Sequence, residues 1–554
     1  MVSKRRVVDH IVDELAARGV EYVFGVDGAN IEDLYDALHF HHGITGVLAK
    51  HEFSAATMAD GFSRASSGLG VVAATSGGGS LNLVAGLGES YASRVPVLAL
   101  VGQAPTGMDG RGSFQDTSGL AGSLDALAVF SAVSVYCRRL VEPSDVVWAL
   151  PEAIAAALEG GPAVLLLPKD VQQSLIGRTR PPSIAPFRRV EEPTSIIDAL
   201  RQTPGPVTIV AGEQVARDDA REQLRKLVRA LNAYVATVPD AKDVAHTTLV
   251  TGVMGHPGVE RAISRSAVCL LVGTRLPVTA RAGLDDALAR TRTISIGSAE
   301  PFVSSEHVHS DDLRRSLDDI GLAMNVRRHQ KREPLPRSEL RPPEHDGAGV
   351  RYRDAMAALD EQMPGDADLV VDAGNSGAAA IHHLSARRGG RFVVALGMGG
   401  MGYSFGSAIG MCFARRRRTV VVAGDGSFFM HGMELHTAIQ YGLPVTVVLF
   451  NNNAHAMCVT RERLFYDDRY SYNRFTPSRL GAGLAAMFPG LPSVDVAEAD
   501  GLPSALRDAF AHDGPSVVSI ECSADEIPPF APFLTPAQHL STPEEMTHDV
   551  AARA

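Results

Sequence analysis

Two residues with hard oxygen donors follow neighbouring hydrophobic runs in the last third of the chain. Asp425 lies in the turn Gly-Asp-Gly-Ser after the run TVVVA, and Asn452 follows the run PVTVVLF. Residues 428–441 between them have helical spacing, so we predict a strand–helix–strand crossover whose two strand ends meet at one edge of a parallel sheet. A carboxylate and an amide oxygen suit Mg²⁺ or Ca²⁺, and the backbone carbonyl of Ala454 is a third candidate ligand.

The turn around Asp425 also favours a phosphate group. Gly424 and Gly426 have no side chain, so the backbone can approach a ligand closely, and the N-terminus of the following helix attracts negative charge. The pattern therefore predicts a cation that holds a phosphorylated ligand. For an isolated Gly-Asp-Gly the alternative is a plain turn without a ligand, and the pairing of Asp425 with Asn452 across an intact crossover argues against it.

A third polar residue, Glu52, lies in the first turn of a predicted helix that follows the strand ITGVLAK. A glutamate at this position commonly does no more than compensate the helix dipole. Here it is followed by the small residues Ala55, Ala56 and Ala59, and then by the segments GFSR and TSGGGSLN. This combination makes Glu52 a candidate functional residue.

The elements that must position these residues fall into three stretches of the chain that share one sequence pattern. Each repeats a Val/Ile/Leu-rich run, a Gly-rich turn and a helical pattern, which is typical of parallel α/β units. We predict an α/β fold with three doubly wound parallel-sheet domains at 1–185, 190–325 and 350–525, a linker at 326–349 and a C-terminal tail at 526–554. The first and third domains are candidates for a shared topology.

Composition limits the compartment and the partners. Of the 554 residues, 45% are hydrophobic and 21% are charged, close to the globular average, and the net charge of −11 argues against nucleic acid or an anionic membrane as a partner. The five scattered cysteines include no CxxC pair, so they indicate neither a disulfide framework nor a zinc site. Since no signal-like or membrane-spanning apolar run is found either, we expect a cytoplasmic protein.

Together these segments resemble thiamine-diphosphate-dependent enzymes, in particular the acetohydroxyacid (acetolactate) synthases. The segment GDG…NN resembles the family's motif for the cofactor's diphosphate and its metal ion. HEFSAATMADGFSRA, YASRVPVLALVGQAPTG, SFQDT and GPAVLLLPKDVQQS extend the resemblance over essentially the whole chain. It implies thiamine diphosphate and Mg²⁺ as cofactors, and pyrimidine-binding, central and diphosphate-binding domains in that order.

The resemblance also implies a role for each matched residue. Glu52 would hydrogen-bond N1′ of the pyrimidine and so promote loss of the cofactor's C2 proton. Met401 would wedge between the two rings, and Gly399 would offer its carbonyl to the 4′-amino group. The implied metal ligands are Asp425, Asn452 and Ala454; the residues beside the reacting atoms are Gly28, Ala29, Phe114 and Gln115; the other cofactor contacts are Asn375, Ser376, Gly424, Gly426, Ser427, Ala456 and Met457.

The expected reaction follows from the family. Its members decarboxylate a 2-oxo acid such as pyruvate and transfer the resulting acyl group to a second carbonyl, so we predict an enzyme, a carboligase similar to acetolactate synthase. The alternatives are a 2-oxo acid decarboxylase, a 2-hydroxyacyl-CoA lyase or, in another class, a relative that binds a nucleotide without catalysis. The histidine pairs at 41–42 and 382–383 do not match the position of the decarboxylases' His-His dyad, and we predict them to be surface residues.

Several residues depart from the acetolactate synthase pattern. Asp27 and Gly78 stand where the family usually has proline, and Ala454 stands where it usually has histidine. Arg461 occupies the place of a tryptophan that shapes the acceptor pocket in those synthases. A basic residue there either binds a carboxylate or phosphate of the substrate or faces solvent. These departures leave the identity of the acceptor and the product open.

Two further expectations concern the assembly and the central domain. In this family the site lies between subunits, so we expect a homodimer or a homotetramer. The central segments GEQV and GTRLPVTARAG loosely resemble the flavin-binding domain of acetolactate synthases, so FAD is either a structural cofactor or lost. The segment GMGGMG also fits the GxGxxG pattern of dinucleotide sites, but no suitable acidic residue follows it.

Overall fold

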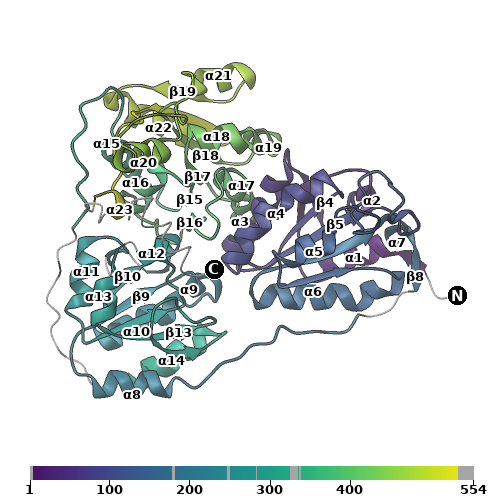
Figure 1. The fold of residues 1–554 in the computed structure, drawn as a ribbon, viewed down its shortest axis with the longest axis horizontal. Helices are drawn as coiled ribbons and strands as arrows, with labels where there is room; N and C mark the ends of the chain where they lie inside the picture. The colour runs from purple at the N-terminus through teal and green to yellow at the C-terminus, as the bar shows by residue number, and fades with distance from the viewer. Residues whose placement is uncertain are drawn as a thin grey trace, which may run out of the picture.

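The computed structural model describes residues 4–177, 181–245, 250–281, 283–324, 335 and 338–534. They form three α/β units, which lie in chain order at the right, lower left and upper left of Figure 1. Part of the predicted linker, at 326–334 and 336–337, and most of the predicted tail, at 535–554, lie outside the described residues. Among the helices of the described residues, none combines the length and the hydropathy that a bilayer crossing requires.

The first unit is a parallel sheet with helices on both faces. Its strands are β2 (Tyr22–Val26), β3 (Thr45–Leu48), β4 (Gly70–Ala74), β5 (Val97–Gln103), β6 (Tyr136–Arg139) and β7 (Pro162–Pro168), in the order β3-β2-β4-β5-β7-β6. Its helices are α1 (Val7–Ala17), α2 (Glu32–Phe40), α3 (Glu52–Ser66), α4 (Gly78–Ala92), α5 (Ala126–Ser131), α6 (Val146–Gly160) and α7 (Lys169–Gln173). A short antiparallel pair, β1 (Lys4–Arg6) and β8 (Leu175–Gly177), lies beside the sheet. Strands such as β5 and β7 are buried throughout, as parallel strands between two helical layers must be.

The third unit repeats this topology. Its strands are β15 (Asp368–Val371), β16 (Phe392–Val394), β17 (Thr419–Gly424), β18 (Val445–Asn451), β19 (Ser493–Val496) and β20 (Ser516–Glu521), in the order β16-β15-β17-β18-β20-β19. Its helices are α15 (Tyr352–Gln362), α16 (Asn375–His383), α17 (Tyr403–Arg415), α18 (Asp425–His431), α19 (Leu435–Gln440), α20 (Ala456–Phe465), α21 (Leu480–Met487), α22 (Leu502–Ala511) and α23 (Ala531–Leu534). In both units the second strand lies beside the first and the sixth lies between the fourth and fifth, which confirms the shared topology.

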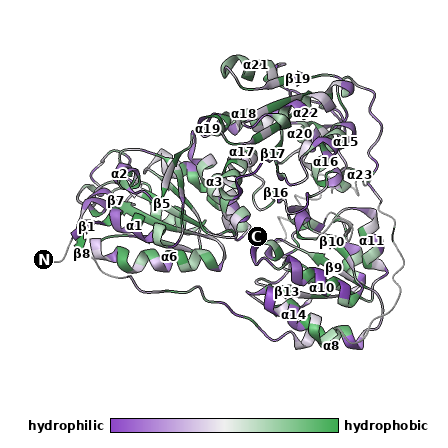
Figure 2. Cartoon of the chain, turned by 180° about the vertical axis from the view of Figure 1, so that it is seen from behind, coloured by the Kyte–Doolittle hydropathy of each residue, from purple (hydrophilic) through white to green (hydrophobic). Residues whose placement is uncertain are grey.

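The central unit has a different strand order. Its strands are β9 (Val207–Ala211), β10 (Tyr234–Thr237), β11 (Val250–Val253), β12 (Val268–Val272), β13 (Arg292–Gly297) and β14 (Glu306–His309), in the order β11-β10-β9-β12-β13-β14. Its helices are α8 (Thr194–Gln202), α9 (Gln214–Arg217), α10 (Arg221–Leu231), α11 (Pro257–Ser264), α12 (Val278–Arg281), α13 (Asp285–Arg290) and α14 (Leu313–Met324). Figure 2 shows the reason for this layering: the strands are largely hydrophobic, whereas helices such as α10 carry one hydrophilic face. The prediction of three doubly wound parallel-sheet domains is confirmed.

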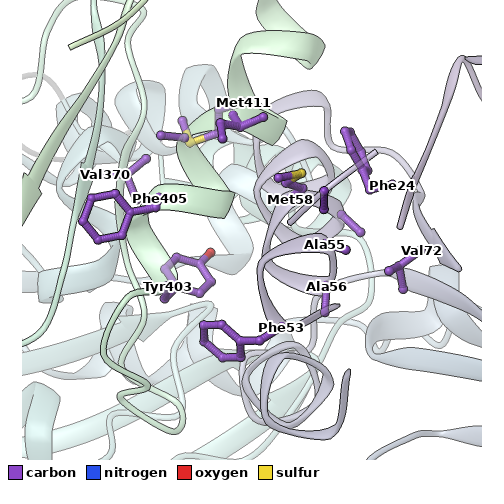
Figure 3. Packing of buried hydrophobic residues seen from close by; sticks show 14 of the residues in the cluster. Phe24, Phe53, Ala55, Ala56, Met58, Val72, Val370, Tyr403, Phe405 and Met411 are labelled. Carbon is purple, nitrogen blue, oxygen red and sulfur yellow. The ribbon is translucent and has the colours of Figure 1, made fainter. Parts of the chain in front are cut away.

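Helices α3 and α17 join the first unit to the third. At Gly406 a Cβ atom would lie 2.5 Å from the carbonyl oxygen of Ser54, and at Gly410 it would lie 1.9 Å from that of Met58. Only glycine allows the two backbones to lie this close. Around this contact Phe53 and Met58 of α3 face Tyr403 and the neighbouring residues of α17 in one continuous core (Figure 3).

The helix predicted at 428–441 is broken in the structure. Helix α18 ends at His431, a 3₁₀ turn covers Gly432–Glu434, and α19 begins at Leu435. At Gly432 a Cβ atom would lie 2.1 Å from the ring of Phe428, so the chain turns tightly over that buried side chain. The break also places the buried carboxylate of Glu434 against the first unit.

The prediction that both histidine pairs are surface residues is wrong for His382. This side chain is buried in the last turn of α16, and its Nε2 accepts the backbone N–H of Leu340 at 3.0 Å. The ring also lies 4.1 Å from that of His256, measured between centroids. The segment that follows the central unit therefore covers the end of α16, a long-range contact that local sequence patterns do not reveal.

Candidate active site

The predicted cation pair meets at one edge of the third sheet. Strands β17 and β18 are parallel neighbours, with Gly424 opposite Phe450, so the residues that follow them end at the same edge. Asp425 is 1% exposed; its Oδ1 accepts the N–H of Gly426 at 2.9 Å and its Oδ2 accepts the N–H of Ala454 at 3.2 Å. The structure thus brings Ala454 beside Asp425.

The chemistry of this edge fits a divalent cation. Burial raises the pKa of Asp425 to about 6, against the opposing effect of the backbone N–H groups of Gly426 and Ala454. Oδ1 of Asn452 is buried, and no atom of the described residues hydrogen-bonds to it. A desolvated carboxylate and an unsatisfied amide oxygen at adjacent strand ends both lack a positively charged partner. Mg²⁺ would be that partner for both.

Three of the cofactor contacts that the family resemblance implies, Asn375, Ser376 and Gly424, also come together. Gly374, with φ of +109°, turns the chain into α16, so that Asn375 and Ser376 are its first two residues. Nδ2 of Asn375 donates to Oγ1 of Thr460 at 3.1 Å, while its buried Oδ1 has no hydrogen-bond partner among the described atoms. A Cβ atom on Gly424 would lie 3.9 Å from Oγ of Ser376. The N-termini of α16 and α18 are therefore neighbours, an arrangement that favours an anion.

Asp372 is a functional candidate that the sequence analysis missed. It is buried directly after β15, where it accepts the N–H of Gly402 at 3.0 Å, Oγ of Ser404 at 2.6 Å and Oγ of Ser427 at 2.7 Å. One carboxylate thus ties together three loops at the carboxyl edge of the sheet. The only local signal is an aspartate at the end of the buried strand DLVVD, which is common in α/β proteins.

The segment predicted to hold the pyrimidine ring lies over the same edge. Gly399 has φ of +64° and Gly402 has φ of +88°, backbone conformations that favour glycine. A Cβ atom on Gly426 would lie 3.3 Å from Cε of Met401 and 2.5 Å from Nδ1 of His455. Met401 therefore reaches the turn that carries Asp425. The remaining candidates, Ala456 and Met457, form the first turn of α20 beside it.

Glu52 is held by its own unit. It is 9% exposed in the first turn of α3, and its Oε2 accepts Nδ2 of Asn82 at 2.9 Å. At Gly79 a Cβ atom would lie 2.9 Å from Oε1 of Glu52 and 2.9 Å from Cγ2 of Thr75. The turn after β4 must therefore be glycine-rich because it passes directly against the carboxylate.

The same turn contacts two of the other candidates, Gln115 and Gly28. Oε1 of Gln115 accepts Oγ1 of Thr75 at 3.4 Å and Oγ of Ser76 at 3.3 Å, and a Cβ atom on Gly28 would lie 2.8 Å from Thr75. The carbonyl of Ala29, next to Gly28, accepts Nζ of Lys169 at 2.6 Å. Phe114 is 74% exposed and contributes no packing to the core.

The region around Glu52 and the region around Asp425 are the two half-sites. They contact each other through residues next to these two candidates. The rings of Phe53 and His431 stack with centroids 4.3 Å apart, and the backbone N–H of Lys50 donates to Oε1 of Glu434 at 3.0 Å. Burial, with a smaller effect of His51, lowers the pKa of His431 to about 4, so this ring is neutral near pH 7. His431 and Glu434 were not found from the sequence because their partners lie nearly 400 positions away.

Arg461 lies on α20, one residue after Thr460, which contacts Asn375. Its side chain is exposed, and it shares a helix face with Met457 because residues four apart lie one above the other. The helix therefore places a guanidinium on the same side as a predicted cofactor contact.

A cavity of about 320 Å³ lies at the carboxyl ends of β9 and β12, where the strand order of the central unit reverses, and residues of the first and third units also line it. Its lining includes Arg94, Arg217 and Arg275; burial, then the neighbouring arginines, lowers the pKa of Arg94. The lining also contains Glu213 and Asp240, so the cavity combines both signs of charge at the edge of the unit for which FAD was considered. FAD is not supported, because neither the family models that match this chain nor its acetolactate synthase relatives name a flavin.

Three family models match the chain in the order of its units. The thiamine pyrophosphate enzyme N-terminal TPP binding domain matches residues 5–122, the thiamine pyrophosphate enzyme central domain matches 194–313, and the thiamine pyrophosphate enzyme C-terminal TPP binding domain matches 372–520. Every candidate site residue lies within the N-terminal or the C-terminal match.

Curated relatives match over nearly the full chain. A probable acetolactate synthase large subunit of Methanocaldococcus jannaschii is 27% identical, with 94% of this chain and 93% of the relative covered. Acetolactate synthase isozyme 2 large subunit of Escherichia coli is 28% identical, with 95% and 97% covered. Among solved structures, benzoylformate decarboxylase from Polynucleobacter necessarius has the same fold, with a TM-score of 0.82 at 20% identity and coverage of 95% of this chain and 100% of that one.

Proposed function

We propose a reaction for this chain from the premise that it belongs to the thiamine-diphosphate-dependent enzymes and is a carboligase of the acetolactate synthase-like family. In this proposal it decarboxylates a pyruvate-like 2-oxo acid and joins the acyl group to a second carbonyl. The observation that carries the proposal is the buried carboxylate of Asp425 together with the unsatisfied Oδ1 of Asn452, which follow the adjacent parallel strands β17 and β18. The 2-oxo acid and the acceptor carbonyl are the small-molecule partners.

The residues have separate tasks in this proposal. Asp425 and Asn452 with the carbonyl of Ala454 hold Mg²⁺, and the N-termini of α16 and α18 bind the diphosphate through Asn375, Ser376 and the Gly424–Ser427 turn. When bound, thiamine diphosphate supplies a carbon nucleophile and accepts the electron pair that loss of CO₂ releases. Glu52 holds or releases a proton at N1′ of the pyrimidine, and its burial against Asn82 and Gly79 keeps bulk water from that proton.

The direct test is an assay of the purified protein with pyruvate, thiamine diphosphate and Mg²⁺, with and without aldehyde, 2-oxo acid or other carbonyl acceptors. We expect CO₂ release together with a 2-hydroxy ketone or 2-hydroxy-2-methyl acid. Acetaldehyde as the sole product would assign the chain to the decarboxylases instead, and cleavage of a 2-hydroxyacyl-CoA would assign it to the lyases.

We also propose that Arg461 selects an acceptor with a carboxylate or a phosphate. The variant Arg461→Gln is expected to raise KM for an anionic acceptor about 10- to 100-fold, because a charged hydrogen bond contributes about 1.5–3 kcal/mol. KM for a neutral aldehyde acceptor should rise much less. Arg463→Gln, on the same helix but bonded to the carbonyl of Asp525, is the matched control. An equal loss with both kinds of acceptor would contradict this role.

A homodimer at minimum, or a homotetramer, is proposed as the active form. Apolar side chains are exposed beside both half-sites: Phe429, Met430 and Met433 follow the Asp425 turn, and Phe114 and Leu120 lie on the loop that carries Gln115. Burial of such side chains against another copy would be favourable. Light scattering of the active protein should give at least twice the chain mass, whereas a fully active monomer would refute this assembly.

The five free cysteines suit a reducing compartment such as the cytoplasm.

A further inference from the structure

Glu89 contacts the segment 397–402 from a different unit of the chain. It lies in the last turn of α4 and is 2% exposed. Its Oε1 accepts the backbone N–H of Gly397 at 3.1 Å, and its Oε2 accepts that of Met398 at 2.6 Å. One carboxylate of the first unit therefore binds two consecutive amides of the third. Figure 1 shows α4 beside α3 on the side of the first unit that faces the third.

The backbone of this segment lies directly on α4. A Cβ atom on Gly397 would lie 2.8 Å from Cβ of Ala92 and 3.0 Å from both Oε1 of Glu89 and Oγ of Ser93. A side chain at position 397 would thus separate the segment from the helix. The glycine makes the two hydrogen bonds of Glu89 geometrically attainable.

The carboxylate of Glu89 is itself fixed. Oγ of Ser93 donates to its Oε1 at 2.7 Å, and Nη2 of Arg64 lies 3.5 Å from the same oxygen. Arg64 is buried and pairs with Asp60 at 2.7 Å. Because the charge of Glu89 is paired and both of its oxygens accept hydrogen bonds, it presents its oxygens to the segment in one arrangement.

The same ionic network reaches the central unit. The carbonyl of Arg64 accepts NH1 of Arg391 at 2.7 Å, and Arg391 pairs with Glu213 at 2.8 Å and Asp243 at 3.0 Å. All of these side chains except Glu213 are almost fully buried. The position of Glu89 is therefore set by contacts among all three units.

The far end of the segment has an independent anchor, since Asp372 accepts the N–H of Gly402. Between the two anchors lie Gly399, with φ of +64°, and Met401, whose Cε reaches the Gly426 turn. The carbonyl of Gly399 and the side chain of Met401 can hold fixed positions only if both ends of the segment are held.

We propose that Glu89 is a positioning residue for cofactor activation, acting through Gly397 and Met398 to place the carbonyl of Gly399 and the side chain of Met401. The inference rests on the proposed function, because the cofactor contacts of Gly399 and Met401 belong to that proposal. Glu89 itself touches neither cofactor nor substrate. Its contacts with the segment are only the two hydrogen bonds from the backbone N–H groups of Gly397 and Met398.

The test uses the protein loaded with thiamine diphosphate and Mg²⁺ and measures hydrogen–deuterium exchange at the cofactor's C2 atom without substrate. In Glu89→Gln one carboxylate oxygen becomes an NH₂ group that faces a backbone N–H, so one of the two bonds is lost. We expect exchange and kcat to fall up to about 100-fold, since a displacement of about 1 Å has effects of this size. KM for the 2-oxo acid should change little.

The matched control is Asp495→Asn. Asp495 also accepts two consecutive backbone N–H groups, of Gly481 at 2.6 Å and Ala482 at 3.0 Å, but at β19, away from the segment. Both variants should have a lower melting temperature, and only Glu89→Gln should slow exchange. Wild-type exchange in cofactor-loaded Glu89→Gln, or equal slowing in both variants, would overturn the proposal.

Two further outcomes are decisive. If Glu89→Gln does not fold, Ser93→Ala, which removes one hydrogen bond to Oε1, must slow exchange by a smaller factor; an unchanged rate then overturns the inference. If the wild-type protein does not bind the cofactor at all, the proposed function fails and this inference fails with it. Cofactor binding by the wild type therefore separates the two.

Discussion

Glu52→Gln is expected to lower kcat by about 100- to 10,000-fold, the range that general acid–base groups contribute. Glutamine keeps the shape of the side chain and can still accept Nδ2 of Asn82, but it cannot exchange a proton with the pyrimidine. The rate of C2 exchange in the bound cofactor should fall with kcat, while the affinity for thiamine diphosphate stays near that of the wild type. Steady-state turnover, C2 exchange and cofactor titration measure the three quantities.

The control for this variant addresses the simplest alternative, that a first-turn glutamate serves only the helix dipole. Glu222 occupies the first turn of α10 in the central unit and is exposed. Glu222→Gln should lose a similar small amount of stability and no activity. If Glu52→Gln retained wild-type turnover, Glu52 would be a structural residue, and the non-catalytic reading of the chain would regain support.

The second large effect is expected at the cation site. Asp425→Asn and Asn452→Ala should each weaken Mg²⁺-dependent binding of thiamine diphosphate by at least about 100-fold, because even residues that only orient metal ligands contribute 10- to 100-fold to affinity. Asp425→Asn removes the buried negative charge, and Asn452→Ala removes the unsatisfied oxygen. Equilibrium dialysis of the cofactor over a range of Mg²⁺ concentrations measures both.

Asp366→Asn serves as the control in the same unit, since Asp366 is an exposed carboxylate ahead of β15. This variant should bind the cofactor with wild-type affinity at every Mg²⁺ concentration. A requirement for Mg²⁺ that is unchanged in Asp425→Asn would place the cation elsewhere and would remove the observation that carries the proposed function.

The features that could be predicted from the sequence are those that residues close together in the chain determine. The strands that end next to Asp425 and Asn452, the glycine turn after β4 and the helix that starts at Glu52 all follow from local runs and turn residues, and the structure has them in place. From the spacing of Asp425 and Asn452 along the sequence we could infer that they follow neighbouring strand ends, because a parallel crossover leaves few arrangements of two adjacent strands.

The residues that the sequence analysis missed act over long distances. Glu89 and Glu434 bind backbone amides about 300 and 400 positions away, and Asp372 joins three loops; at each position the local pattern shows only a carboxylate on a helix or after a strand. The break at Gly432 depends on the packed ring of Phe428, and burial of His382 depends on the segment around Leu340. Tertiary packing decided these features against local propensity.

Isothermal titration calorimetry of the wild-type protein with thiamine diphosphate, with and without Mg²⁺, tests the central claim most directly. We predict saturable binding of one cofactor per chain in the presence of Mg²⁺, and much weaker binding once the cation is chelated. The absence of binding in the presence of Mg²⁺, or binding of equal strength after chelation, would contradict a site built from Asp425 and Asn452.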